Sequence, residues 1–146
     1  MNEATEPTQR VPEPALIQYT HWIYGLHALS VLIAVLGHET VAVRFVFGLP
    51  SIVAVLMNYA RRSEAHGTFL QSHFHWQIRT FWFALLWVIS IIVISLPLML
   101  LLGLGFFTLY LGLVAVGIWV IYRIVRGWLA LRDGRPVMVA TPVAAA

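Results

Sequence analysis

The sequence predicts an all-α integral membrane protein, a four-helix bundle of two helical hairpins with its N- and C-termini in the cytoplasm. Three observations lead to this fold class. Of the 146 residues, 60% are hydrophobic and only 10% are charged, and the mean hydropathy is +0.84. No residue from Thr80 to Tyr122 carries a formal charge. The arginines gather outside the apolar segments or at their edges.

A polar tail is expected at each end of the membrane domain, which we place at residues 16–136. Residues 1–15 contain three glutamates and three prolines ahead of any apolar run, which is the wrong order for a signal peptide with a basic start. Residues 137–146 read VMVATPVAAA and show no helical pattern. We therefore expect both tails to be disordered.

The first hairpin is predicted from two apolar segments that a polar turn separates. A helix needs about 20 apolar residues to cross about 30 Å of hydrocarbon, and residues 17–36 and 41–60 meet this length. The residues between them read GHET, in which Thr40 is suited to cap the second helix. Pro50 is expected to kink this second span locally.

The charge-free stretch predicts the second hairpin. As one helix it would be about 65 Å long, roughly twice the bilayer core. Pro97 and the Gly103-Leu104-Gly105 sequence offer a break. We therefore expect spans at about 80–102 and 106–125, with residues 61–79 as an amphipathic loop on the cytoplasmic side between the two hairpins.

The arginines predict the orientation, because short cytoplasmic loops carry the excess of positive residues. With four spans, Arg44 is the one arginine on the far side of the membrane. The remaining arginines lie in the N-terminal tail, the 61–79 loop and the C-terminal flank: Arg10, Arg61, Arg62, Arg79, Arg123, Arg126, Arg132 and Arg135. Three spans would put the basic regions on opposite sides, so the charge distribution supports the turn near Gly103.

The segment SHFHWQIRTFWFALLW, residues 72–87, places polar side chains directly before an apolar span. On a helix, Phe74, Ile78 and Phe81 share one arc, and the histidines, the glutamine and Arg79 spread over the other side. Two interpretations remain open. The polar groups lie either in the headgroup region of a helix that enters the bilayer, with Arg79 snorkelling, or in a polar site between helices.

Two segments carry a resemblance to a known family. FLQSHFHWQIRTFWFALLW (69–87) and YRIVRGWLALRDGRP (122–136) are similar to segments of a family of small proteobacterial membrane proteins. That family is related to the twenty-kilodalton inner-envelope subunit of the chloroplast protein-import (Tic) machinery. The resemblance implies four helices with both ends in the cytosol, and it implies no particular activity. Its motif positions here are His73 and Gln77, and the closing basic motif at Tyr122, Arg123, Gly127, Trp128 and Gly134.

The histidines leave a cofactor alternative open. Two neutral imidazoles on facing helices hold a b-type haem through its axial positions, and His21 in the first span lies at a level similar to that of His73 or His75. His27 lies about 9 Å deeper than His21 along its helix. A zinc site was also considered. Its possible ligands do not have the spacing of a zinc-binding motif: Glu64, His66, His73 and His75. We expect no cofactor and no metal, with haem as the alternative.

Charge content also bears on transport and catalysis. Coupled carriers use ionisable groups inside the bilayer, but the only charge within the first three predicted spans is Arg44, near Glu39 at the end of its span. No serine lies in the elbow typical of a nucleophile, and without cysteine there is no thiolate.

The sequence favours a non-enzymatic accessory or scaffold component of a complex in the bacterial inner membrane. The alternative is a small-molecule transporter or a haem-binding bundle.

The expected partners follow from the basic, apolar character of the chain. They are the lipid bilayer with its anionic headgroups, and either another membrane protein or a second copy of this chain. The net charge of +3 without a stacking platform argues against nucleic acid. The candidate interface positions are polar or basic residues near the cytoplasmic surface: His73, Gln77, Arg79, Arg123, Arg126 and Trp128.

Overall fold

Helices account for most of the chain that the structure, a computed structural model, describes, namely residues 10–101 and 103–137. They are α1 (Pro14–Leu36), α2 (Val41–Phe47), α3 (Leu49–Ala60), α4 (Leu70–Leu100) and α5 (Leu104–Arg132), and these ranges contain no strand. The all-α prediction is confirmed for them. Most of the two expected tails, residues 1–9 and 138–146, lies outside the described residues.

The lengths of the helices are compatible with a membrane protein. Within the described part of the chain, α1, α4 and α5 are each long and apolar enough to cross a membrane. The α2 and α3 helices reach that length only as a pair, which is bent by 50° at its junction. The described residues therefore contain three segments of membrane-spanning length, or four if the bent pair counts as one.

The junction between α2 and α3 depends on a glycine followed by a proline. Gly48 has an extended conformation, with ψ at 135°, and Pro50 lies in the first turn of α3, where a missing N–H breaks no helical hydrogen bond. A Cβ at Gly48 would overlap the carbonyl of Arg44 and lie 2.8 Å from Ser30 Oγ. The kink expected near Pro50 is thus confirmed as a full break between two helices.

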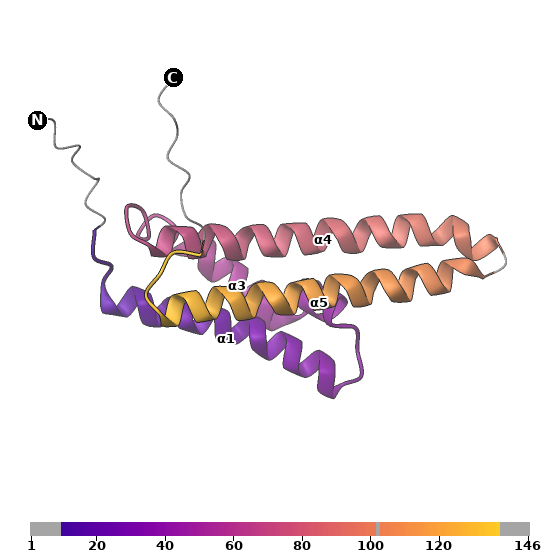
Figure 1. The fold of residues 1–146 in the computed structure, drawn as a ribbon, viewed down its shortest axis with the longest axis horizontal. Helices are drawn as coiled ribbons and strands as arrows, with labels where there is room; N and C mark the ends of the chain where they lie inside the picture. The colour runs from indigo at the N-terminus through magenta and orange to yellow at the C-terminus, as the bar shows by residue number, and fades with distance from the viewer. Residues whose placement is uncertain (1–9, 102, 138–146) are drawn as a thin grey trace, which may run out of the picture.

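The α4 and α5 helices form a long antiparallel hairpin, and their ribbons run side by side over their whole length (Figure 1). The α4 helix passes through Pro97 and ends at Leu100. Gly103 lies in the turn that follows, with a φ of 72° that glycine adopts without strain. A Cβ at Gly105 would overlap the backbone of Ser95 and Met99. The predicted break near Gly103 is confirmed.

Both helices of this hairpin extend beyond the predicted apolar spans. α4 begins at Leu70 rather than near residue 80, and α5 ends at Arg132 rather than near residue 125. The reason is that buried side chains such as Phe74 continue the inner face of α4 through the polar segment. Hydropathy marks where a helix suits lipid, whereas packing against α1 and the C-terminal segment extends the helix further.

The first three helices cover only part of this hairpin. α1 packs most extensively on α3 and α2, and α2 lies against α5. Figure 1 shows that the α4–α5 hairpin continues well past the end of α1 and the turn that leads to α2. We call the opposite end, where α1 and α4 begin and α5 ends, the polar end of the bundle.

Candidate functional site

A group of polar side chains is buried between α1, α4 and α5 near the polar end. We call it the polar core, and it comprises the buried residues Tyr24, His27, His73, Gln77 and Thr80 together with the half-buried Arg123. His73, Gln77 and Thr80 are respectively 0%, 2% and 3% exposed. The interfacial interpretation of residues 72–87 is therefore wrong for these three side chains, which lie between helices. His75 and Arg79, in contrast, are exposed.

His73 joins α1 to the segment that follows α5. Its Nε2 lies 2.8 Å from the carbonyl oxygen of Arg135, which only accepts hydrogen bonds, so Nε2 carries the proton and donates. Its Nδ1 is then an acceptor, and the hydroxyl of Tyr24 donates to it at 3.1 Å. The backbone N–H of Val137 donates to Ser72 Oγ at 3.1 Å. These bonds form a clasp that holds residues 135–137 on the start of α4.

An ion pair lies just before this clasp in the chain. The guanidinium of Arg135 donates to Asp133 Oδ2 at 2.7 Å. This hydrogen bond holds the pKa of the Asp133 carboxyl below its usual range. Asp133 follows the last residue of α5, so the pair lies where the chain leaves that helix.

Arg123 joins α5 to α4 through hydrogen bonds and ring stacking. Its Nε donates to Thr80 Oγ1 at 2.7 Å and its Nη2 donates to the Trp76 carbonyl oxygen at 3.3 Å. Its Cζ lies 3.4 Å from the centre of the Trp76 ring, which is a close cation–π contact. In return, Trp76 Nε1 donates to the carbonyl oxygen of Arg123 at 3.1 Å.

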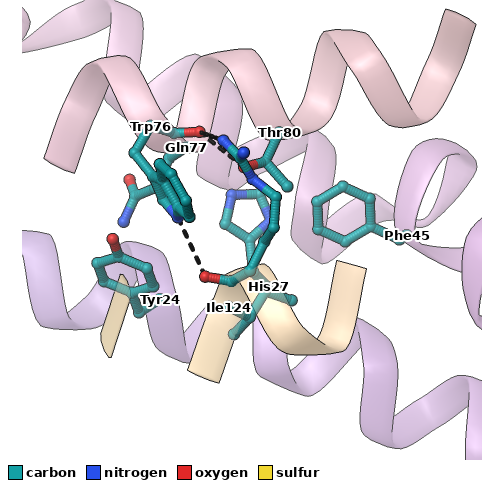
Figure 2. A pocket seen from close by; sticks show the side chains of 8 residues that line it. Tyr24, His27, Phe45, Trp76, Gln77, Thr80 and Ile124 are labelled. Carbon is teal, nitrogen blue, oxygen red and sulfur yellow. Dashed lines mark hydrogen bonds between the residues drawn. The ribbon is translucent and has the colours of Figure 1, made fainter. Parts of the chain in front are cut away.

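A small cavity lies within the polar core, and its lining includes Tyr24, His27, Gln77 and Arg123 (Figure 2). Its volume of about 10 Å³ is that of a single water molecule. His27 Nδ1 lies 3.3 Å from Ser51 Oγ. Among the described residues, His27 Nε2 and both polar atoms of the Gln77 amide have no hydrogen-bond partner. The cavity therefore has unpaired polar groups but no room for an organic substrate.

The remaining predicted positions lie on the surface of the polar end. Arg79 is exposed beside the ring of Phe83 on the same helix. Arg126 is exposed and donates to the Tyr122 hydroxyl at 2.8 Å. Trp128 stacks on Tyr24 with ring centres 6.4 Å apart. The structure thus brings three predicted residues, His73, Gln77 and Arg123, into one internal group and leaves Arg79, Arg126 and Trp128 outside it.

Like Thr80, Tyr24 is a site residue that the sequence analysis missed. It is 1% exposed and contacts both His73 and Trp128. His21, Tyr24 and His27 recur every three residues, so they lie along one side of a helix. Trp128 Nε1 donates to His21 Nδ1 at 3.0 Å, which places His21 at the edge of the same group. That spacing was the signal that could have identified Tyr24.

Three of the histidines, His21, His27 and His73, make side-chain hydrogen bonds. Both ring nitrogens of His73 make hydrogen bonds, and one nitrogen of His21 accepts from Trp128. In residues 10–101 and 103–137, no three His, Asp or Glu side chains come close enough together to hold a metal ion. The zinc set considered from the sequence is therefore not assembled. Comparisons with protein-family models, curated proteins and solved structures found no match to this chain.

The close approach of α5 to Tyr24 requires Gly127. A Cβ at this position would overlap the Tyr24 hydroxyl and lie 2.8 Å from Cε1 of the ring, which the His73 hydrogen bond holds in place. We expect Gly127→Ala to lower the free energy of unfolding by about 1–3 kcal/mol through overpacking. Titration of the purified protein with a denaturing detergent, followed by tryptophan fluorescence, measures this change.

Gly25→Ala is the matched control for this prediction. A Cβ at Gly25 would meet no atom within 4 Å, and alanine favours a helix over glycine by about 1 kcal/mol. We therefore expect this variant to unfold at the same detergent concentration as the wild type or at a higher one. Equal destabilisation by the two variants would contradict the packing of Tyr24 on Gly127.

Proposed function

We propose that the protein is a four-helix membrane bundle of the bacterial inner membrane, with both termini in the cytoplasm, and that it acts without catalysis as an accessory or scaffold component of a membrane complex. The observation that carries this proposal is that the polar core connects the helices to one another. His73 and Arg123 connect three helices and the C-terminal segment. Their cavity has room for about one water molecule. These side chains support the fold and leave no space for a substrate.

The orientation is supported by where the arginines lie on the folded chain. Arg123 contacts Trp76 near the start of α4, so the basic ends of α4 and α5 lie together. Arg44 lies apart from them, on α2, where its Nε is 3.5 Å from Glu39 Oε2. This distribution agrees with the excess of positive residues on the cytoplasmic side of membrane proteins.

The surface offered to a partner is the exposed part of the polar end. Arg79, Arg126 and Arg132 are exposed there, together with the partly exposed ring of Trp128. Arginine and tryptophan are enriched at the centres of protein interfaces, and each arginine near an anionic surface contributes about 1 kcal/mol. We propose an acidic loop of a membrane protein as the partner and anionic lipid headgroups as neighbours. Protein import is an analogy that the family resemblance suggests.

The test is a pull-down of the tagged protein from its native membrane in mild detergent. We expect a reproducible partner at fixed stoichiometry, and we expect Arg79→Gln with Arg126→Gln to reduce its recovery about 30-fold, because two such contacts contribute about 2 kcal/mol. The matched control replaces the same two arginines with lysine, which keeps both charges and should keep the partner.

Three outcomes would count against this proposal. Recovery of the protein alone, without a stoichiometric partner, would contradict the accessory role. An absorbance band in the Soret region of the same sample, lost in His21→Ala, would replace that role with haem binding. A partner retained equally by the glutamine and lysine variants would show that the exposed arginines are not its binding surface.

A further inference from the structure

The turn between α1 and α2 lies beside the middle of α5, far from the tip of the α4–α5 hairpin. A Cβ at Gly117 would lie 3.2 Å from Cβ of Val41, the first residue of α2. Gly117 is about 20 Å along α5 from Leu104, at a rise of 1.5 Å per residue. Figure 1 shows the same offset, because the hairpin tip continues well past this turn.

The α4–α5 hairpin is the element that fits the full thickness of a bilayer. Thr80 to Leu100 rises about 30 Å, which equals the hydrocarbon core. Leu100, Phe106 and Phe107 near the tip are 89%, 67% and 66% exposed, as expected for side chains in contact with lipid. With the tip at the far surface, the α1–α2 turn lies inside the bilayer, about 10–20 Å below that surface.

A groove of about 340 Å³ lies between this turn and α5. One wall is polar and includes His38, Glu39 and Thr40. The other wall is apolar and includes Leu113, Val114, Ile118 and Ile121. A molecule that fits both walls must have a polar and an apolar part, and the bilayer around the groove is composed of such molecules.

The charges at the polar wall favour one kind of headgroup. The side chain of Glu39 is 48% exposed, and its Oε2 lies 3.5 Å from Nε of Arg44. This Nε makes no hydrogen bond among the described residues. The pair is therefore attracted by charge without being hydrogen-bonded, and the carboxylate is left to accept further donors. A carboxylate accepts hydrogen bonds from a primary ammonium group, whereas a quaternary ammonium group has no N–H to donate.

We propose that this groove binds a phospholipid of the far leaflet that has a primary amine headgroup, phosphatidylethanolamine, and holds that headgroup below the level of its neighbours. The ammonium group binds Glu39, the phosphate lies near His38 and Thr40, and an acyl chain lies along the apolar wall of α5. The first hairpin then enters the membrane from the cytoplasmic side and turns back inside it. This inference rests on the membrane placement proposed above, but not on the existence of a protein partner.

Lipid selectivity of the purified protein tests the site directly. Delipidated protein in detergent is mixed with equal amounts of phosphatidylethanolamine, phosphatidylcholine and phosphatidylglycerol, and the retained lipid is counted by native mass spectrometry. We expect one phosphatidylethanolamine per chain, with about a tenfold preference that Glu39→Gln removes. Glu64→Gln is the matched control, because Glu64 is an exposed acid 3.7 Å from Arg61 at the polar end, and it should keep the preference.

Equal retention of the three lipids, a preference for phosphatidylglycerol, or loss of selectivity in both glutamine variants would overturn the proposal. A chain pair of twice the mass with no retained lipid would also overturn it, because a second copy would then fill the groove. None of these results depends on whether the pull-down finds a partner, so the failure of one proposal is distinguishable from the failure of the other.

The depth of the turn is measured separately. The chain has no cysteine, so His38→Cys and Leu101→Cys each provide a unique site for a fluorescent label. In phosphatidylethanolamine vesicles, we expect lipids with quenchers near the bilayer centre to quench the label at position 38 more than the label at position 101. Equal quenching, or stronger deep quenching at position 101, would show that the turn lies at the surface and would overturn the buried headgroup site.

Discussion

Arg123→Ala is expected to lower the free energy of unfolding by about 3 kcal/mol. The substitution removes the charge-assisted hydrogen bonds to Thr80 Oγ1 and the Trp76 carbonyl, and it removes the cation that stacks on the Trp76 ring at 3.4 Å. Denaturing-detergent titration of the purified protein measures the change. The connection between α4 and α5 near the polar end should loosen first, which increases hydrogen exchange in residues 73–80.

Arg126→Ala is the control for this experiment, because it removes the same side chain one helical turn away. Arg126 is exposed, and its hydrogen bond goes to Tyr122 on its own helix. We expect a loss of about 0.5 kcal/mol, as for other exposed interactions. If both variants lost the same stability, the effect would arise from net charge, and the specific contacts of Arg123 would not explain it.

His73→Ala is expected to have a similarly large effect, about 3 kcal/mol. The imidazole is fully buried, and its removal leaves a cavity as well as an unpaired Tyr24 hydroxyl and an unpaired Arg135 carbonyl. The clasp should open as a result. We expect the amide hydrogen of Val137, which is bonded to Ser72 Oγ, to exchange faster than in the wild type.

Two further variants make the His73 prediction specific. His75→Ala changes an exposed histidine two residues away and should alter stability by less than about 0.5 kcal/mol. Combined with Tyr24→Phe in a double-mutant cycle, His73→Ala should show a coupling energy of about 1 kcal/mol, the contribution of one hydrogen bond. Additive effects of the two substitutions would mean that this hydrogen bond contributes nothing to stability.

The segment 72–87 shows why the site could be only partly predicted. Its polar residues were correctly identified as a group that needs an explanation. However, a helix at a lipid surface and a helix with a polar seam toward its neighbours have the same periodicity along the sequence. The structure separates the two cases residue by residue, because His73 and Gln77 are buried while His75 and Arg79 are exposed. The neighbours that decide this, Tyr24 and Arg123, lie far away in the sequence.

Some helix boundaries follow from the local sequence, and others depend on packing against segments that are distant in the chain. Turns were predicted near residues 37–40 and at Gly103, because polar residues or glycines interrupt long apolar runs there. The start of α4 and the end of α5 were placed too far inside the helices. Packing between helices stabilises helical turns outside the apolar span, and the hydropathy of the sequence does not predict that packing. The break at Gly48 depends on Arg44 and on Ser30 of α1.

The sequence by itself determined the all-α class, the apolar segments that are long enough to cross a membrane, and the place of the main turns. These properties depend on local composition, on the length of apolar runs and on residues with special backbone preferences. Only the tertiary structure decided that the buried His73 and the half-buried Arg123 connect helices, and that the α1–α2 turn lies beside the middle of α5. The burial and hydrogen bonding of a side chain depend on helices that are distant in the chain, and their register is set by contacts formed only on folding.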